Sequence, residues 1–303
     1  MREAELFCEM QAALGEGPVF HTESNSLYWT DILKKQLHSF SLHEKRLTTI
    51  QTDKHIGAFS FVDEKTLVVA ADNGFSFFDL EDATFTFITD PEEALPQNRF
   101  NDGKCDARGR FWAGTMEFKP TSPNGSLYRL DTTRNALKLE SSIIISNGLA
   151  WNKDHTIMYH VDSGRNAIYE YNYDLETGTI HNRKLLYTFE NDYGTPDGIA
   201  IDSNDCLYIA LWGGAKVIYF NPTTCEILEE IVIPAPHVTS VTFGEKDFKT
   251  LYITTARDGL SSEQLEQYPL SGSVFKVDVP VAGIPLHPYQ SCKGVIQSEN
   301  CKL

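Results

Sequence analysis

The chain has 303 residues, of which 41% are hydrophobic and 22% are charged, and its formal net charge is −16. An acid excess of this size repels phosphate backbones, which argues against a nucleic-acid partner. No apolar run reaches the ~18 residues that cross a membrane, and residues 1–5 do not begin a signal peptide, so no membrane partner is expected. The six cysteines form neither a CxxC pair nor a zinc-binding spacing, which predicts a reducing, cytoplasmic location.

The first predicted element is a short strand over residues 4–8, which has no partner nearby in the sequence. A strand rich in aromatic and β-branched residues then recurs at 27–31, 66–70, 109–113, 156–160, 206–210 and 250–254. Most copies are followed by a second strand-like run, as at 36–40, 126–130, 167–171, 216–220 and 273–277. The one predicted helical turn covers residues 262–268.

The recurring strands begin roughly 40–50 residues apart, which is the repeat length typical of β-propeller blades. Six repeats predict an all-β fold, a six-bladed β-propeller that forms one domain over residues 1–303. The alternative is a β-sandwich, in which the regular spacing would be a coincidence. The N-terminal strand is expected to complete the last blade, and residues 291–303 are expected to form a loose tail.

Polar segments precede or begin the strands that a propeller turns toward its axis. They cover residues 14–20, 98–104, 145–151 and 195–201. Each places glycine close to an acidic or amide residue, which permits unusual backbone conformations and close approach. Equivalent positions in successive blades converge, so we expect four side chains to meet at the axis: Glu16, Asn101, Asn147 and Asp197.

Two carboxylates and two amide carbonyls make an all-oxygen ligand set, which suits a hard divalent cation, although softer transition metals stay open. A cation also offsets the cost of burying two carboxylates in a channel. The alternative is that Asn147 and Asp197 are ordinary turn residues, because Asn-Gly and Asp-Gly pairs are common turn signals. Their recurrence in register with the blades favours the metal site.

These segments resemble the SMP-30/gluconolactonase/regucalcin-like family, and the resemblance covers nearly the whole chain. It rests on residues 14–20, 98–104 with 109–116, 146–149, 196–198 and 255–259, which follow in the family's order. Residues 210–214 and 260–268 look closer to the bacterial sugar lactonases than to the animal calcium-regulating members.

The resemblance implies a six-bladed propeller and a lactone hydrolase. It further implies that Glu16, Asn147 and Asp197 bind one divalent metal ion, and that Arg99 and Asn101 face the substrate. Some members carry a substrate-contacting glutamate shortly after the Gly-Thr-Met run. Here Lys119 stands at that place, with Glu117 two residues earlier, so the resemblance leaves the choice of substrate open.

The predicted reaction is the metal-dependent hydrolysis of aldonolactones such as xylono-, arabino- or gluconolactone, with Ca²⁺, Zn²⁺, Mn²⁺, Mg²⁺ or Fe²⁺ as the cation. Asp197 is the candidate general base, and Asn101 is expected to stabilise the oxyanion. Arg99 would orient sugar hydroxyls. Strand alternation is expected to turn Asp102 away from Asn101. His160 and His237 are interpreted as packing or loop histidines near the channel mouth.

Other functions stay open from the sequence. The propeller could bind calcium or another metal without an enzymatic role, although Arg99 beside the cation favours the enzyme. It could also be a related aryl-ester or organophosphate hydrolase, which would need apolar pocket walls. The loop between residues 116 and 125 is a predicted lid. We expect a small-molecule partner and a monomer or weak homo-oligomer.

Overall fold

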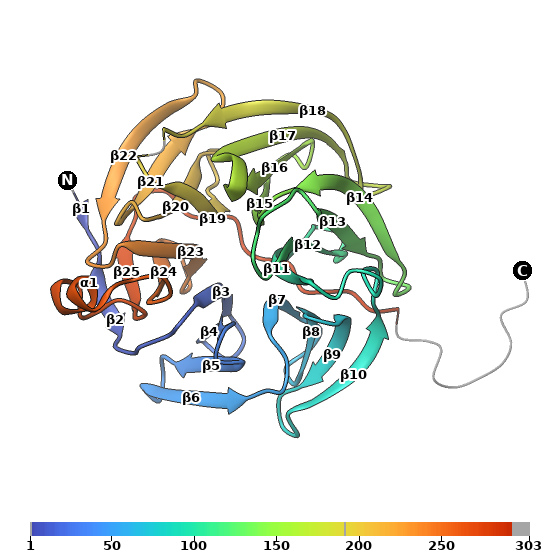
Figure 1. Ribbon diagram of the computed structural model, residues 1–303, viewed down its shortest axis with the longest axis horizontal. Helices are drawn as coiled ribbons and strands as arrows, with labels where there is room; N and C mark the ends of the chain where they lie inside the picture. Colours follow the sequence, from blue (N-terminus) through green and yellow to red (C-terminus); the bar gives the residue numbers. More distant parts are fainter. Residues whose placement is uncertain (1, 191, 293–303) are drawn as a thin grey trace, which may run out of the picture.

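The structure is a computed structural model that describes residues 2–190 and 192–292. Its strands form four separate four-stranded sheets and one nine-stranded sheet, which surround a common centre (Figure 1). The all-β class is confirmed, and the repeated sheets are those of a propeller-type fold. Within the described residues, no helix has the length and apolar character needed to cross a membrane.

Each four-stranded sheet runs antiparallel from the centre outward in chain order. The first holds β3 (Gly15–His21), β4 (Ser26–Asp31), β5 (Gln36–Ser41) and β6 (Arg46–Gln51). The second holds β7 (Ile56–Phe61), β8 (Thr66–Ala71), β9 (Gly74–Asp79) and β10 (Thr84–Thr89). The third holds β11 (Asn98–Cys105), β12 (Phe111–Glu117), β13 (Gly125–Leu130) and β14 (Ala136–Ile143). The fourth holds β15 (Ser146–Trp151), β16 (Ile157–Asp162), β17 (Ala167–Asp174) and β18 (Thr179–Thr188).

The nine-stranded sheet consists of two four-stranded groups and a short edge strand. One group is β19 (Thr195–Ile201), β20 (Leu207–Trp212), β21 (Lys216–Asn221) and β22 (Glu226–Val232), with β1 (Arg2–Glu3) paired to β22. The other is β23 (His237–Gly244), β24 (Thr250–Ala256), β25 (Val274–Asp278) and β2 (Glu5–Cys8). A single residue pair, Trp212 with His237, joins the two groups. The N-terminal segment therefore adds an outer strand beside β25.

The inner strands close the ring. Each packs against the next in the order β3, β7, β11, β15, β19 and β23, and β23 packs against β3. The strand that recurs in the sequence is the second strand of each four-stranded group. The inner strands did not stand out as strands, because they carry glycine, proline and amide residues that are typical of turns. The hydrophobic core lies between neighbouring sheets, as where Phe75 of β9 meets Phe100 of β11 at a ring-centroid distance of 4.7 Å.

Every inner strand shifts register against its second strand near the same point. Such bulges redirect side chains and often lie beside functional sites. Glycines allow the inner strands to approach each other here: a Cβ on Gly148 would lie 2.6 Å from the Ile199 nitrogen, and one on Gly198 would lie 2.1 Å from Ser240 Oγ. The bulges therefore set which polar side chains face the axis.

Residues 279–292, called the strap below, cross one face of the ring. The strap donates backbone hydrogen bonds to Ile201 from Ile284, to Phe61 from Tyr289 and to Gly109 from Gln290. The described part of the predicted tail, residues 291–292, includes a hydrogen bond from Cys292 to Thr132, and residues 293–303 lie outside the described chain.

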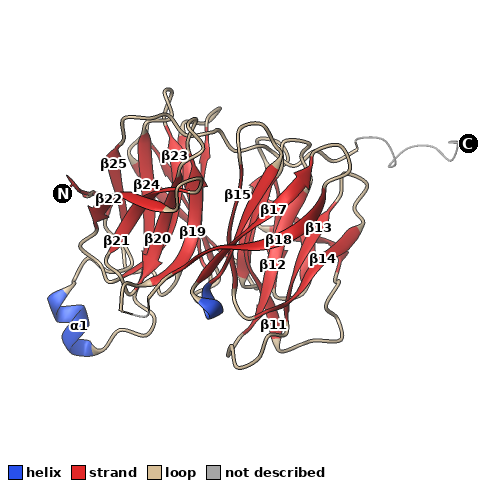
Figure 2. Ribbon diagram, turned by 90° about the horizontal axis from the view of Figure 1, so that it is seen from above, coloured by secondary structure: helices blue, strands red, loops and turns tan. Residues whose placement is uncertain are grey.

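The predicted helical turn is confirmed as α1 (Ser262–Gln267), which begins with a capping box between Ser261 and Gln264. Together with the 3₁₀ turn η1 (Ser163–Arg165), α1 lies at one face of the ring (Figure 2). The strap's partners lie instead at the ends of the inner strands or in the loops that follow them, as Phe61, Ile201 and Gly109 do. The two faces of the ring are therefore built differently.

Candidate functional site

The four polar segments of the sequence meet in one cavity of about 440 Å³, at the face where the inner strands begin. Its polar lining consists of Glu16, Arg99, Asn101, Asn147, Ser163, Thr195, Asp197 and Asp258. The predicted site residues come from the inner strands β3, β11, β15 and β19, which the ring arranges around one cavity. Their side chains are nearly fully buried: Glu16 is 4% exposed, Asn147 4% and Asp197 5%.

Glu16 and Asp197 are two buried carboxylates close enough to influence each other's ionisation. Burial, with a smaller contribution from the charge of Asp102, raises the pKa of Glu16 to about 8. Burial first, and then the charge of Glu16, raises the pKa of Asp197 well above its ordinary value. Two carboxylates in this position are unfavourable when both are ionised, and a cation between them removes the penalty.

Unpaired oxygens identify where a cation fits. Asn147 Oδ1 and Asp197 Oδ1 are buried without a hydrogen-bond partner. The other end of the Asn147 amide is held in place, because its Nδ2 donates to Ser163 Oγ at 3.1 Å, and that hydroxyl donates to the Pro196 carbonyl at 2.6 Å. Orphaned buried oxygens beside a carboxylate pair are what an oxygen-liganded divalent cation requires. The residues therefore fit the implied metal.

The described residues include no group of three or more His, Cys, Asp or Glu side chains arranged to hold a metal ion. The candidate set instead takes its third ligand from an amide, as the sequence predicted. An all-oxygen set with one neutral ligand suits hard cations rather than a structural zinc ion.

Arg99 and Asn101 form a fixed pair beside the carboxylates. The Arg99 guanidinium donates from Nη1 to Asn101 Oδ1 at 2.7 Å and to the Phe100 carbonyl at 3.0 Å. Asn101 Nδ2 donates to the Ser146 carbonyl at 2.9 Å. Burial lowers the pKa of Arg99 to about 10, which the charges of Glu16 and Asp197 oppose. One amide hydrogen and the remaining guanidinium donors are left for a ligand.

Asp102 and Lys104 are two further charged residues of β11. The sequence did not predict that Asp102 influences the candidate ligands or that Lys104 bonds to a neighbouring strand. Asp102 follows the bulge at Asn101 and keeps its carboxylate beside the channel, where its charge acts on both Glu16 and Asp197. The cavity that Asn101 lines does not include Asp102, which is compatible with the expected turn of Asp102 away from Asn101. Lys104 Nζ donates to the Ile199 carbonyl of β19 at 2.8 Å, and burial lowers the pKa of Lys104 to about 8.

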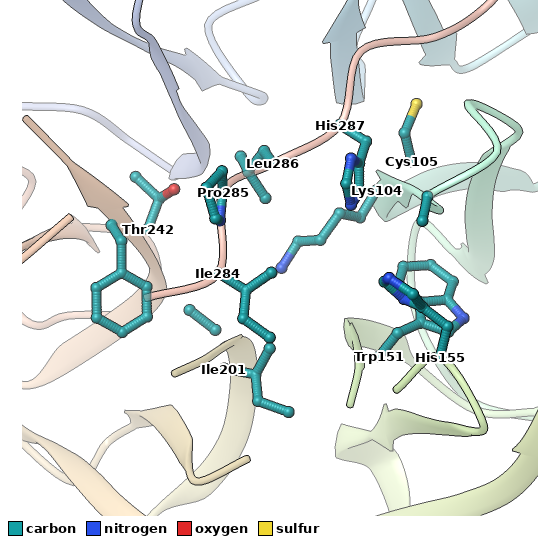
Figure 3. A pocket seen from close by; sticks show the side chains of 13 residues that line it. Lys104, Cys105, Trp151, His155, Ile201, Thr242, Ile284, Pro285, Leu286 and His287 are labelled. Atoms are coloured by element: carbon teal, nitrogen blue, oxygen red, sulfur yellow. The ribbon is translucent and has the colours of Figure 1, made fainter. Parts of the chain in front are cut away.

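The opposite end of the channel is covered by the strap. Figure 3 shows the Lys104 side chain extending toward Ile284 of the strap, with Trp151 and His155 to one side. The cavity there measures only about 40 Å³, whereas the cavity at the other face measures about 440 Å³.

The two histidines lie as the sequence interpretation placed them. His160 is buried, with Nε2 2.8 Å from Ser146 Oγ, and burial lowers its pKa to about 4. His237 stacks on Trp212 at a centroid distance of 4.0 Å, and its Nδ1 lies 2.8 Å from the Asp258 carbonyl. Neither imidazole lines the cavity, although His237 supports Trp212, which does.

The loop after β12 differs from the expectation for Lys119. Phe118 and Pro120 line the cavity and Lys119 does not. Glu117 organises this loop by accepting hydrogen bonds from Thr121, Ser122 and Asn124. Sequence reasoning missed Phe118, and it missed Trp212 and Asp258 as lining residues, because their approach to the cavity depends on ring closure.

Comparisons with known proteins identify the family of this chain. The sequence profile of the SMP-30/Gluconolactonase/LRE-like region matches residues 14–257. YvrE of Bacillus subtilis, which carries the provisional name of a sugar lactone lactonase, is 34% identical over 95% of this chain and 98% of its own. The 6-deoxy-6-sulfogluconolactonase of Pseudomonas putida is 36% identical over 91% of this chain and 95% of its own.

Among solved structures, regucalcin from Agrobacterium tumefaciens, described as a calcium-binding protein, superimposes with a TM-score of 0.90 at 26% identity. The match covers 95% of this chain and 99% of that one. The chain therefore belongs to the SMP-30/gluconolactonase/LRE-like family.

Proposed function

We propose that this protein hydrolyses sugar lactones to the corresponding aldonic acids and that the reaction depends on one divalent cation. The observation that carries the proposal is the pair of unpaired, buried oxygens on Asn147 and Asp197 at the base of an open cavity. Two relatives named as lactonases, each matched over more than nine-tenths of this chain, support the lactone as substrate.

We further propose that the fold is a single six-bladed propeller. This count treats the two four-stranded groups of the nine-stranded sheet as separate blades, because among the described residues their strands pair at one position, Trp212 with His237. The site would then lie on the axis of the ring, as ligand sites of propellers do.

Glu16, Asn147 and Asp197 would hold the cation. A bound divalent cation would polarise the lactone carbonyl and lower the pKa of water. Its identity among Ca²⁺, Mg²⁺, Mn²⁺, Fe²⁺ and Zn²⁺ is part of the test below.

Asp197 is the proposed general base. Its carboxylate would help to hold the cation and would accept a proton from the attacking water. Asn101 Nδ2, fixed by its bond to the Ser146 carbonyl, would donate its second hydrogen to the oxyanion. Arg99 would orient the substrate through the donors that Asn101 and Phe100 leave free.

A metal-binding role without catalysis is the second candidate, since the similar regucalcin structure is described as a calcium-binding protein. Arg99 argues for the enzyme, because a guanidinium beside the ligand set weakens cation binding and serves no purpose in a pure binder. We also infer a cytoplasmic location, because no disulfide joins the five described cysteines.

The test follows acid release from five- and six-membered aldonolactones by chelator-treated protein, with each of the five cations added back singly. We expect hydrolysis above the spontaneous rate with at least one cation, and a loss of more than ~100-fold in Asp197→Ala. Asp154→Ala, at an exposed aspartate outside the cavity, is the matched control. Tight cation binding without hydrolysis of any lactone would replace the enzyme by the metal-binding role.

A further inference from the structure

The outer part of the site cavity is apolar. Leu14, Leu33, Met116, Phe118, Pro120 and Trp212 line it, and we call these six residues the apolar mouth. They lie in or beside the sheet that begins with β3, the sheet that begins with β11 and the group that begins with β19. Different parts of the ring therefore contribute to the apolar mouth. A substrate that reaches the polar base must therefore place its remote part against these side chains.

Two residues of the apolar mouth are exposed and gather at the same cavity. Phe118 is 43% exposed and Leu33 is 39% exposed, and both line the cavity. Exposed apolar side chains gathered around a cavity with a polar base indicate a ligand that covers them. The apolar mouth therefore offers a substrate apolar contact area in addition to the proposed polar contacts at the base of the cavity.

The aromatic rings at the mouth are held in place. Trp212 stacks on His237 with an interplanar angle of 15°, and that imidazole is bonded to the Asp258 carbonyl. Phe118 packs edge-to-face on His55 at 5.3 Å, and the Arg99 guanidinium carbon lies 6.0 Å from its ring centroid. Fixed rings bind a ligand with little loss of side-chain entropy.

The charges of the residues that line the cavity disfavour an anionic substituent. Among the residues that line it, Arg99 is the one cation, and it is buried and bonded to Asn101 and Phe100. The acids are Glu16, Asp197 and Asp258, of which Asp258 is exposed. A phosphate or sulfonate in the mouth would meet Asp258 and no exposed cation of the lining, which disfavours it by like-charge repulsion.

We propose that Phe118 and Trp212 are specificity-determining residues that select lactones whose ring carries an uncharged, apolar alkyl or aromatic substituent over lactones that carry a phosphate or sulfonate. This inference rests on the proposed lactone hydrolysis. Burial of an apolar substituent against the mouth would add binding free energy that the reacting ring does not supply.

The first test compares kcat/KM for δ-valerolactone and δ-nonalactone, which share one ring and differ by a butyl substituent. We expect at least about tenfold higher kcat/KM for δ-nonalactone, and Phe118→Ala should remove most of that ratio. Phe87→Ala, at a 57% exposed phenylalanine of β10 that does not line the cavity, should keep it. Equal kcat/KM for δ-valerolactone and δ-nonalactone in the wild-type protein would overturn the inference.

The second test compares glucono-δ-lactone with its 6-phosphate. The kcat/KM for the neutral lactone should be at least about tenfold higher than that for the phosphorylated lactone, and Asp258→Asn should reduce this ratio. A preference for the phosphorylated lactone would overturn the inference.

Binding of unreactive lactams separates this inference from the proposed function. If no lactone is hydrolysed, the proposed function fails, and calorimetry with δ-valerolactam and its butyl-substituted analogue still tests the mouth. We expect at least about tenfold tighter binding of the butyl lactam, lost in Phe118→Ala. Equal binding of the two lactams would contradict the role of the apolar mouth.

Discussion

Asn147 on β15 and Asp197 on β19 each bury a side-chain oxygen that has no hydrogen-bond partner, and Ser163 connects their strands by bonding to Asn147 Nδ2 and to the Pro196 carbonyl. A pair of unpaired buried oxygens costs free energy unless a ligand satisfies them. The two strands shift register at these residues, and both side chains line the same cavity. This arrangement is the structural basis for the proposed cation site.

Removing the amide oxygen of Asn147 should weaken binding of the proposed cation. Asn147→Ala deletes one ligand and leaves Glu16 and Asp197 without their neutral partner, so we expect metal affinity to fall by more than ~100-fold. Calorimetric titration of chelator-treated protein with Ca²⁺ measures it. Asn204→Ala, at an exposed turn position, is the control and should bind like the wild type. Wild-type affinity in Asn147→Ala would exclude this residue as a ligand.

The metal-free protein should lose stability as pH rises. Folding raises the pKa of Glu16 from 4.5 to about 8, so between those values the folded state binds a proton that the unfolded state has released. The free energy of unfolding then decreases with rising pH, and the stabilisation present below about 4.5 is lost as pH rises through about 8. Asp197, whose pKa is also raised, acts in the same direction.

The melting temperature in chelator, measured from pH 5 to pH 8, tests this pH dependence. We expect a decline that a saturating divalent cation reverses most strongly at pH 8, where both carboxylates ionise most readily. Glu16→Gln should flatten the decline, because its amide does not titrate. The same slope in the wild type and in Glu16→Gln would exclude Glu16 as its source.

Arg99 should matter for the substrate more than for the metal. Arg99→Lys keeps the charge but loses the planar donor set that holds Asn101 Oδ1, so kcat/KM for the lactone should fall about 10- to 100-fold. Metal affinity should stay within a few-fold of the wild type. Arg46→Lys, at a guanidinium whose side chain is 70% exposed, is the matched control. A large loss of metal affinity in Arg99→Lys would assign Arg99 to the cation site instead.

The strap should stabilise the fold without taking part in catalysis. Tyr289 is 1% exposed, belongs to the core cluster that contains Phe111 and Tyr128, and donates from its hydroxyl to the Asp131 carbonyl at 2.7 Å. Tyr289→Ala should lower the free energy of unfolding by about 3–5 kcal/mol, and Tyr289→Phe by about 1 kcal/mol. Urea denaturation measures both, and lactone hydrolysis by the folded protein should be unchanged. Equal stability of the two variants would mean that the ring does not pack as described.

The sequence predicted the repeat and the four candidate ligand positions but not the strand order within a blade. The aromatic second strands stand out because they are buried between sheets, whereas Glu16, Asn101, Asn147 and Asp197 lie on inner strands that contain turn-type residues. Their glycines serve close packing between neighbouring blades rather than turns, which no local pattern reveals.

Two other features depend on tertiary structure alone. The register shift of β11 between Phe100 and Asp102 arises from its pairing with β12, which the sequence of β11 alone does not specify. The apolar mouth combines Leu33, Phe118 and Trp212, which are far apart in the chain and meet because the ring closes. Lys119 lies between Phe118 and Pro120 but does not line the cavity, and only the folded loop determines which of these residues face it.

The most direct measurement titrates chelator-treated protein with a divalent cation while lactone hydrolysis is followed by acid release. We predict that activity rises linearly and reaches its plateau at one equivalent of cation per chain, and that Asn147→Ala stays inactive at that stoichiometry. Full activity in the metal-free protein, or a plateau that Asn147→Ala reaches with the same stoichiometry, would contradict a catalytic cation held by Glu16, Asn147 and Asp197.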